Sequence, residues 1–420
     1  MRRCIERFGE RFAAALTLVL VAVDAHGVSF SLDGRFKAFG SDAYLPDGDA
    51  QREADGSPVL DGGVDLRLML KGEEGPFHLI ADLSTIDVGG DSFAFGRAPG
   101  RTLDQTPRDD NGRFMDLTWT LTDGDRYRAY QRFDRLAVEY RAEDFGITVG
   151  RQAVTWGSGI VFQPLDLFAP FAPTTVDRDY KPGEDVILFD HLIGEGDDLQ
   201  VLGVFRRDLE GHREASEDSF GAKWHVVAGE RELDFVVGRH YEDGVFGGGL
   251  HAPIGGALFR TDVLATDLHD GSWVFSGVAN VDYSLTLAGR NTYVFAEYFR
   301  NGFGVAASAV DLARLPERLR VRLARGEVFN VMRDYSALGV NVEWHPLWTQ
   351  TLTWIANWHD GSSLVQSELR FEPGNSTRLD LGVLDSLGSK GDEYGSIPLP
   401  GTPFTTGGGV QAYLRFVYFR

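Results

Sequence analysis

The last strand-forming segment of the chain, Val410 to Phe419, alternates strictly between two kinds of side chain. In an extended strand, successive side chains point to opposite faces. One face here is apolar and rich in aromatic residues, with Val410, Ala412, Leu414, Phe416 and Tyr418, and it is opposed by Gln411, Tyr413 and Arg415. A terminal strand of this kind must close against other strands, and in a membrane β-barrel it pairs with the first strand and faces lipid. The pattern therefore predicts a transmembrane β-barrel.

This ending resembles the C-terminal assembly signal of outer-membrane proteins. In that signal, aromatic or aliphatic residues stand at alternate positions counted back from a final aromatic residue. Tyr418, Phe416 and Leu414 keep the register, whereas the chain ends in Arg420 with Phe419 before it. The resemblance implies the bacterial outer membrane as the location and the barrel-assembly machinery as a partner.

The first 25 residues have the pattern of a secretory signal peptide. An apolar run from Phe12 to Val23 follows four arginines, which are Arg2, Arg3, Arg7 and Arg11. Val23 and Ala25 supply the small residues that a signal peptidase needs, so we expect cleavage before His26. The run of about a dozen residues is shorter than the roughly 20 that a membrane-spanning helix requires. We therefore expect a mature chain of residues 26–420.

Composition narrows the possible partners. The only cysteine, Cys4, lies in the expected signal peptide, so the mature chain would have no disulfide and no thiol nucleophile. The full chain has 41 basic and 62 acidic residues, and without residues 1–25 the counts are 37 and 59, a net charge of −22. Such a surface repels nucleic acid. It suits outer-membrane lipid and lipopolysaccharide, where divalent cations bridge acidic loops to the lipid.

Short alternating segments separated by turns or polar loops recur along the chain. No apolar stretch after residue 25 approaches the length of a membrane helix. The segments predict one antiparallel up-and-down barrel of about 16 to 18 strands. They are 30–39, 64–70, 76–84, 131–141, 145–155, 198–206, 219–228, 231–241, 256–265, 272–283, 291–300, 336–345, 348–358, 362–371, 376–385 and 410–419, with 113–121 and 185–192 as weaker candidates.

The connections sort by length, as they do in outer-membrane barrels. Tight turns facing the periplasm are expected at Lys71–Gly75, Ala142–Asp144, Gly229–Glu230 and Pro373–Asn375. Long polar segments, which would face outward or fold inward, are 40–59, 85–112, 156–184, 301–330 and 386–408. Counting 113–121 as a spanning strand would put the turn at 142–144 on the outer side. We therefore expect a loop hairpin at 113–121.

The segment Leu312–Ala324 fits two periodicities. Its arginines alternate with apolar residues as in a strand, but its leucines recur at spacings of three and four after Pro316. The leucine spacing favours a short helix in a long loop. A strand would instead add three arginines to the lumen.

Other all-β architectures fit the sequence less well. An array of sandwiches would need linkers, and a solenoid would need a visible repeat. The sequence has no Pro/Ser-rich linker, no shift in composition and no repeated period.

The segment Gly150–Asp185 holds four prolines, too many for a central strand. A proline-stiffened, aromatic-rich loop of this length is usually functional or ordered by packing. We expect residues 156–184 to fold into the lumen and narrow it. The charged side chains that this would bring there are Asp166, Asp177, Arg178, Asp179, Lys181, Glu184 and Asp185. The alternative is an external loop packed on its own Phe162, Leu165, Phe168 and Phe171.

Candidate arginines for the facing wall lie just before this loop. Arg126, Arg128 and Arg132 share one strand face, Arg135, Glu139 and Arg141 follow on the next register, and Arg151 is one hairpin away. Arginines opposite an acidic loop would set up a transverse field that screens solutes by charge. The alternative is that they are the ordinary polar half of a barrel strand.

Several motifs together resemble a family of porin-like outer-membrane proteins of proteobacteria. They are Arg151-Gln152 followed by Trp156-Gly157 and Pro164-x-Asp166, the strand Tyr335–Pro346, the turn Asn357-x-x-Asp360-Gly361-Ser362, and the loop Asp392–Gly395 before a last aromatic strand. The resemblance covers roughly residues 130–420. It implies a barrel and passive transport, without naming a solute.

Signals for enzymatic chemistry are weak. The sequence has neither a GxSxG serine elbow nor an HExxH zinc helix, and its histidines are scattered. A hydrolase at the barrel rim would need a pair such as Ser219 with His225 or Ser272 with His269. An acidic segment near Asp47 lacks the glycine of a calcium loop, because Arg52 stands at that position. We expect no catalytic residue, no metal and no cofactor.

The sequence therefore predicts an outer-membrane channel for passive diffusion of small solutes, either general or selective. Two alternatives stay open from other classes besides the rim hydrolase. One is a component of lipid or hydrophobic-compound export, which predicts an apolar lumen with a lateral opening. The other is a barrel scaffold for a partner protein, which predicts a wide lumen without an inward loop. Assembly into a homo-oligomer would need a flat apolar face that the sequence does not separate from the lipid face.

Overall fold

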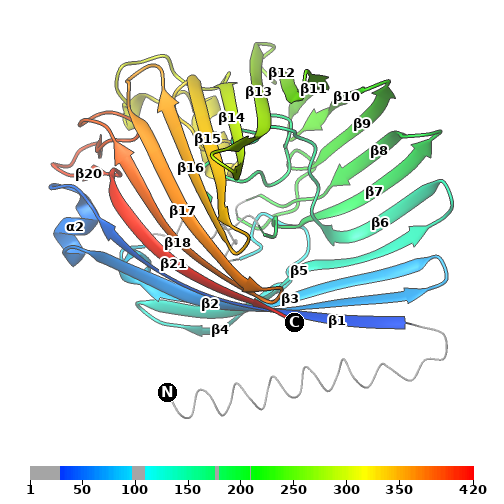
Figure 1. The fold of residues 1–420 in the computed structure, drawn as a ribbon, viewed down its shortest axis with the longest axis horizontal. Coiled ribbons are helices and arrows are strands. Elements are labelled where there is room, and N and C mark those ends of the chain that lie inside the picture. Colours follow the sequence, from blue (N-terminus) through cyan, green and yellow to red (C-terminus); the bar gives the residue numbers. More distant parts are fainter. Residues whose placement is uncertain (1–28, 97–108, 176–178, 209) are drawn as a thin grey trace.

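A computed structural model describes residues 29–96, 109–175, 179–208 and 210–420. The expected signal peptide, residues 1–25, lies outside the described residues. Eighteen antiparallel strands form one closed barrel (Figure 1). β1 (Ser29–Tyr44) pairs with β2 (Val59–Glu74) on one side and with β21 (Gly409–Phe419) on the other. The remaining strands of the wall are β3 (Phe77–Gly90), β5 (Tyr127–Arg141), β6 (Phe145–Gln152), β7 (Glu184–Ile193), β8 (Asp197–Val204), β9 (Ser219–Ala228), β10 (Arg231–His240), β11 (Asp243–Ile254), β12 (Ala257–Asp267), β13 (Trp273–Leu287), β14 (Arg290–Arg300), β15 (Asp334–His345), β16 (Trp348–Asn357), β17 (Ser363–Gly374) and β18 (Thr377–Leu387).

The last strand closes the barrel in the predicted orientation. Its register with β1 runs from Arg35 opposite Phe419 to Tyr44 opposite Val410. Leu414 is exposed on the outer surface, whereas Arg415 is 2% exposed inside. The predicted pairing of the last strand with the first is confirmed. Closure removes the two free edges that β1 and β21 would have in an open sheet.

The outer surface of the wall is apolar. Large hydrophobic side chains with about half of their surface exposed occur on strands around the barrel, and they include Phe235, Phe246, Phe275, Leu338 and Leu381. Inward positions on the same strands are often charged or polar, such as Asp234 and Asp380. Apolar residues outside and polar residues inside are the reverse of a soluble barrel and match one that spans a membrane.

The connections differ between the two ends. One end of the barrel holds the start of β1 and the end of β21. At this end, eight turns of two or three residues join the strands, at 75–76, 142–144, 194–196, 229–230, 255–256, 288–289, 346–347 and 375–376. Each of the four predicted tight turns overlaps one of these. Long loops gather at the opposite end, which in such barrels faces outward.

The sequence pattern did not predict strand β11, but it correctly predicted a loop hairpin at residues 113–121. β11 has the sequence DGVFGGGLHAPI, and its three successive glycines remove the alternation on which strand prediction depends. Residues 113–121 do not span the barrel: β4 (Thr118–Asp123) pairs only with part of β5, beyond the end of β6. With β11 added and β4 left out, the strand count is even and the eight turns given above share one end.

The long loop between β14 and β15 contains the predicted short helix, α4 (Glu317–Arg325). It follows Pro316 and ends at Gly326, whose φ of 71° is the left-handed conformation that favours glycine. Leu319 is fully buried against Phe303 and Leu268, so the leucine periodicity gave the correct structure and the strand alternative was wrong. The other short elements are α2 (Ala50–Asp55), α3 (Asp91–Ala94), η2 (Leu312–Arg314), β19 (Ile397–Pro398) and β20 (Thr405–Thr406). Within the described ranges, no helix has the length and apolar character needed to cross a membrane.

The apolar outer face makes the stability of the barrel depend on where a charge is placed. Leu381 lies near the middle of β18, opposite Leu369 and Leu414, and faces outward. We expect Leu381→Arg to destabilise the folded protein in lipid vesicles by about 2–4 kcal/mol, the cost of a basic residue at the centre of a bilayer. Urea unfolding followed by tryptophan fluorescence would measure this. Leu387→Arg, on the same strand and face but at the rim, should cost about 0–1 kcal/mol, and equal effects of the two changes would contradict a lipid-facing surface.

Candidate functional site

The described parts of the loop between β6 and β7, residues 153–175 and 179–183, lie inside the barrel (Figure 1). Its first limb, from Trp156 to about Phe171, packs on the inward faces of strands β8 to β15. Its last limb, from Asp179 onward, contacts β1, β2 and β18. The loop therefore joins two sides of the wall across the interior.

The first limb is held by apolar contacts. Trp156 meets Phe168 edge-on at 5.1 Å and packs with Val204 and Val236 of the wall. Phe162 is stacked on Phe299 of β14, with the ring centres 4.5 Å apart. These contacts remove large apolar side chains from water, which is the main favourable term for holding the loop inside.

Two carboxylates on the strands bind the main chain of the same limb. Glu297 of β14 accepts hydrogen bonds from the N–H groups of Ile160, Val161 and Phe162 at 2.7, 3.0 and 2.8 Å. Asp262 of β12 accepts from the N–H and hydroxyl groups of Ser158 at 2.8 and 2.7 Å. A loop buried in a barrel must satisfy its backbone donors, and these carboxylates do so with charge-assisted bonds. Neither residue was predicted from the sequence, because inward polar residues are ordinary in a barrel strand: β14 has Glu297 as its one acid, whereas β12 has Asp267 besides Asp262.

The last limb lies on an arginine-rich part of the wall. Asp179 pairs with Arg378 of β18 and lies 3.7 Å from Arg35 of β1. The ring of Tyr180 lies under two guanidinium groups, at 4.6 Å from Arg35 and 4.2 Å from Arg67. At Asp179 an acid of the loop and the arginines of the wall are in direct contact, so their charges are paired there.

A second ion pair fastens the two limbs of the loop to each other. Lys181 pairs with Asp166, and its ammonium group also donates to the carbonyl of Val154 at 2.5 Å. Burial raises the pKa of the Asp166 carboxyl and lowers the pKa of the Lys181 ammonium, and in each case the partner opposes the shift. A buried pair of this kind is strongly destabilised when one partner is removed.

The arginines of the wall are neutralised by acids of the same wall. Arg67 binds Asp134 at 3.0 Å, and Arg415 and Arg370 bind Asp380 at 2.7 and 2.8 Å. A β-bulge in β5 helps to build this network. The register shifts between Asp82 opposite Arg135 and Leu83 opposite Phe133, so that Asp134 is an extra residue. The extra residue allows both Asp134 and Arg135 to be buried inside the barrel. It also places the predicted set that contains Arg132 and the set that contains Arg135 on the same face of β5.

The predicted residues fall into three groups. Arg132, Asp166, Asp179 and Lys181 lie at the loop or at the inner wall beneath it. Arg126 is exposed and pairs with Asp91 of α3, while Arg128 donates to Thr120 of β4 at 2.7 Å, so both belong to the long-loop end. Asp177 and Arg178 lie outside the described residues.

Arg151, Asp185 and Glu184 form the third group, at the ends of β6 and β7. Arg151 binds Asp185 at 2.8 Å, Asp110 at 2.9 Å and the carbonyl of Met115 at 2.6 Å. Burial acts to raise the pKa of Asp110, but Arg151 and two other arginines hold it below its ordinary value. Glu184 pairs with Arg206 at 3.4 Å. These contacts join strand ends to the 110–117 segment, which fills the wall where β6 and β7 end early.

The serine and histidine contacts differ from the pairs considered from the sequence. His225 binds Asp234 at 2.9 Å, whereas Ser219 binds Nδ1 of His240 at 3.1 Å. Ser219 is 1% exposed and also receives hydrogen bonds from Arg206 and the N–H of Tyr241. A hydroxyl that is buried and accepts two bonds is placed to hold strand ends together rather than to attack a substrate. Among the described residues, no group of three or more His, Cys, Asp or Glu side chains is arranged to hold a metal ion.

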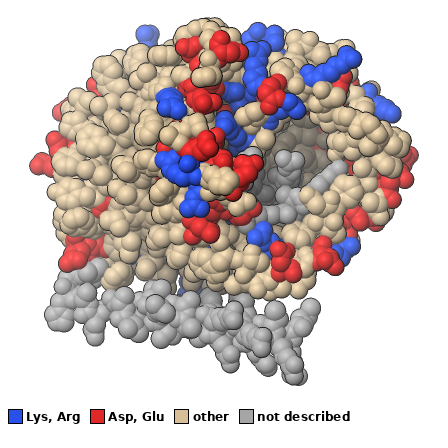
Figure 2. Space-filling view, turned by 180° about the vertical axis from the view of Figure 1, so that it is seen from behind, with Lys and Arg blue, Asp and Glu red and all other residues tan. Residues whose placement is uncertain are grey.

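One face of the molecule is hollowed. Figure 2 shows a hollow on the face opposite to that of Figure 1, with acidic and basic side chains close together along its rim. The mixture of both signs at the rim matches the paired charges inside.

Comparison with known proteins identifies the fold. No protein-family model matches the chain, and neither does any curated protein sequence. Among solved structures, OccAB1 of Acinetobacter baumannii matches with a TM-score of 0.55 at 8% identity, over 94% of this chain and 98% of that one. OccAB3 of the same organism gives 0.54 at 9% identity (93% and 99% covered), and OpdL of Pseudomonas aeruginosa gives 0.52 at 12% identity (93% and 98% covered). These proteins are outer-membrane porins. The chain therefore has the fold of an outer-membrane porin barrel, and its 18 strands lie within the range of 16 to 18 predicted from the sequence.

The Glu297 contacts predict how the loop is released. Glu297→Ala would remove the acceptor of three N–H groups, of which those of Val161 and Phe162 are buried, at a cost of about 1–3 kcal/mol for an unsatisfied group. We expect the barrel to stay folded and cleavage within residues 156–184 by proteinase K to become about 5- to 150-fold faster. Mass spectrometry of the fragments would locate the cuts. Glu343→Ala, which removes an acid that bonds only Asn291 in the described structure, should leave the rate unchanged, and faster cleavage in both variants would contradict a specific anchor.

Proposed function

We propose that this protein is an outer-membrane channel for passive, solute-selective diffusion of small hydrophilic or amphipathic solutes. One observation carries the proposal: the 156–184 loop crosses the interior from Glu297 on β14 to Arg378 on β18. A closed barrel of this size without an inward loop would be a wide pore. The loop reduces the opening to a passage lined by paired charges and aromatic rings.

The proposed mechanism follows from these contacts. A solute entering from the long-loop end would pass the edge of the loop, with the ion-paired arginines of β1, β2 and β18 on one side. Because Arg35 and Arg378 are paired with Asp179 of the loop, polar solutes can exchange hydrogen bonds with both signs of charge. Selectivity then depends on the width of the passage and on how firmly these pairs are held.

The path to the membrane is part of the same proposal. Residues 1–25 would act as the signal peptide, the barrel-assembly machinery would insert residues 26–420, and the acidic outer loops would meet lipopolysaccharide through divalent cations. Association into a homo-oligomer would use part of the apolar outer face.

Nothing in the described interior favours the other candidate functions. Export of lipid or hydrophobic compounds would call for an apolar lumen and a lateral opening, whereas the wall around the loop carries Arg67, Asp134 and Asp380 and pairs continuously from β1 to β21. A scaffold for a partner protein would need the interior to be free, and the loop occupies it.

The channel is tested by planar-bilayer conductance of refolded residues 26–420. Deleting residues 160–180 should increase the size of the single-channel steps, because the segment that crosses the interior is removed. The same variant should carry Glu297→Gln, so that no anchor carboxylate is left buried without its partners, and Glu297→Gln alone is the control. Steps of unchanged size after deletion would contradict a constriction by the loop, and no steps from any form would contradict a channel.

The Asp179 pair predicts ion selectivity. Asp179→Asn would leave Arg35 and Arg378 with less compensating charge, so anions should permeate more readily relative to cations. One unit charge at about 10 Å in water changes the energy of an ion by about 0.4 kcal/mol, which corresponds to about a twofold change in the permeability ratio. The reversal potential in a salt gradient measures this ratio. Asp144→Asn, at an exposed position in the turn between β5 and β6, is the control, and a shift toward cations in Asp179→Asn would contradict the assignment.

A further inference from the structure

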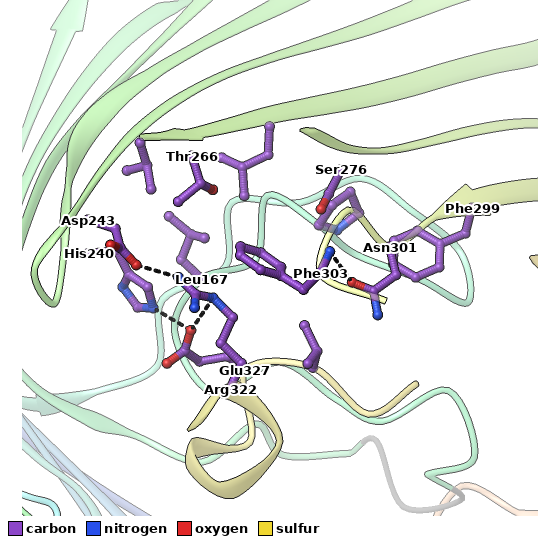
Figure 3. A pocket seen from close by; sticks show the side chains of 14 residues that line it. Leu167, His240, Asp243, Thr266, Ser276, Phe299, Asn301, Phe303, Arg322 and Glu327 are labelled. Atoms are coloured by element: carbon purple, nitrogen blue, oxygen red, sulfur yellow. Dashed lines mark hydrogen bonds and ion pairs between the residues drawn. The ribbon is translucent and has the colours of Figure 1, made fainter. Parts of the chain in front are cut away.

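A pocket lies between the inward loop and the wall, on the side of α4 (Figure 3). Leu167 of the loop, the inward faces of β10 to β14, and the segment at the end of α4 enclose it. About 60 Å³ of it is open to the centre of a water-sized sphere. A second cavity, with about 40 Å³ of such space, shares Pro164, Phe299, Asn301 and Val328 with it, so the space continues along the loop.

Among the described residues that line this pocket, Arg322 is the one arginine or lysine, and it already has acidic partners. Arg322 pairs with Asp243, lies 3.6 Å from Glu327, and has its guanidinium group 3.9 Å from the ring centre of Phe303. Its charge is thus balanced by acids of the same pocket. An anionic ligand would gain little from Arg322 and would meet the carboxylate of Glu327.

The hydrogen bonds of Ser219 determine which nitrogen of His240 carries a proton. The Ser219 hydroxyl accepts from Nη1 of Arg206 at 2.8 Å and from the N–H of Tyr241 at 3.2 Å. Its own proton is then donated to Nδ1 of His240 at 3.1 Å. Nδ1 therefore acts as an acceptor, and Nε2 of the neutral ring carries the N–H.

This leaves one donor and one acceptor close together without a hydrogen bond, although Arg322 and Arg325 lie 3.6 and 3.8 Å from the Glu327 carboxylate. Within the described part of the chain, Nε2 of His240 and Oε1 of Glu327 have no hydrogen-bond partner, although His240 is only 6% exposed. The nearest approach of the two groups, from Nε2 to Oε2, is 3.7 Å, too long for a hydrogen bond. Buried polar groups are normally satisfied, so an oxygen atom that both accepts and donates would suit this gap.

We propose that the pocket binds a small neutral solute with an apolar body and one hydroxyl group, of which phenol is the simplest example. The hydroxyl oxygen accepts from Nε2–H of His240 and donates to the carboxylate of Glu327, while the body packs on Leu264 and Phe299. A carboxylate cannot donate to Glu327, and an ammonium group cannot accept from His240. The role of this site in transport rests on the proposed channel function, because the pocket lies beside the loop that narrows the passage.

Binding is measured on the refolded chain in detergent micelles by isothermal titration, with the heat of empty micelles subtracted. We expect phenol to bind at least about tenfold more tightly than toluene, which lacks the hydroxyl, and than benzoate, which is an anion. His240→Phe removes the donor, and Leu264→Trp fills the pocket without touching the polar pair. Each should weaken phenol binding by at least about tenfold.

The control is His225→Phe, which changes an inward histidine of the neighbouring strand that binds Asp234 and does not line the pocket. It should leave phenol binding unchanged, and circular dichroism checks that each variant is folded. Equal affinities for phenol and toluene, or phenol binding that survives both His240→Phe and Leu264→Trp, would overturn the proposal. If the protein conducts ions but does not bind phenol, the proposed binding site is wrong and the channel proposal stands. If it binds phenol but does not conduct ions, the channel proposal is wrong and the binding site stands.

Discussion

Pairing of the first strand with the last is the constraint on which the rest of this structure depends. In a membrane, each backbone N–H and C=O group must be satisfied within the protein, and a sheet can do this only when it is closed. The register between β1 and β21, with Arg35 opposite Phe419, provides the closure. Once the barrel is closed, alternation along each strand sends apolar side chains to the lipid and the remainder to one shared interior.

That interior is filled in two different ways. On the side of β8 to β15, apolar side chains receive the aromatic limb of the inward loop, and single acids such as Glu297 satisfy its main chain. On the side of β1, β2 and β18, arginines and aspartates neutralise each other and hold Asp179. Charges inside a barrel away from bulk water need partners, so an arginine-rich wall requires acids close by. The loop is therefore positioned by packing at one end and by ion pairs at the other.

Much of the fold could be read from local patterns, and the exceptions have identifiable causes. Alternation located the strands apart from β11, whose glycines Gly247, Gly248 and Gly249 carry no side chains to alternate. Leucine spacing identified α4 despite its alternating arginines. The site was harder to predict from the sequence. The acids that hold the loop, Asp262 and Glu297, lie 104 and 137 residues along the chain from Ser158 and Ile160, which they bind. No local pattern connects residues so far apart.

The sequence by itself determined the class of structure, because period-two alternation, short turns and the absence of membrane-length apolar runs leave a membrane β-barrel as the arrangement that satisfies both lipid and backbone. The tertiary structure alone decided what each charged residue does. Arg126, Arg132 and Arg151 look alike in the sequence, yet one is exposed at the long-loop end, one is buried at the inner wall and one joins the ends of strands. The physical reason is that the environment of a charge is set by partners brought together only when the barrel closes and the bulge at Asp134 shifts the register.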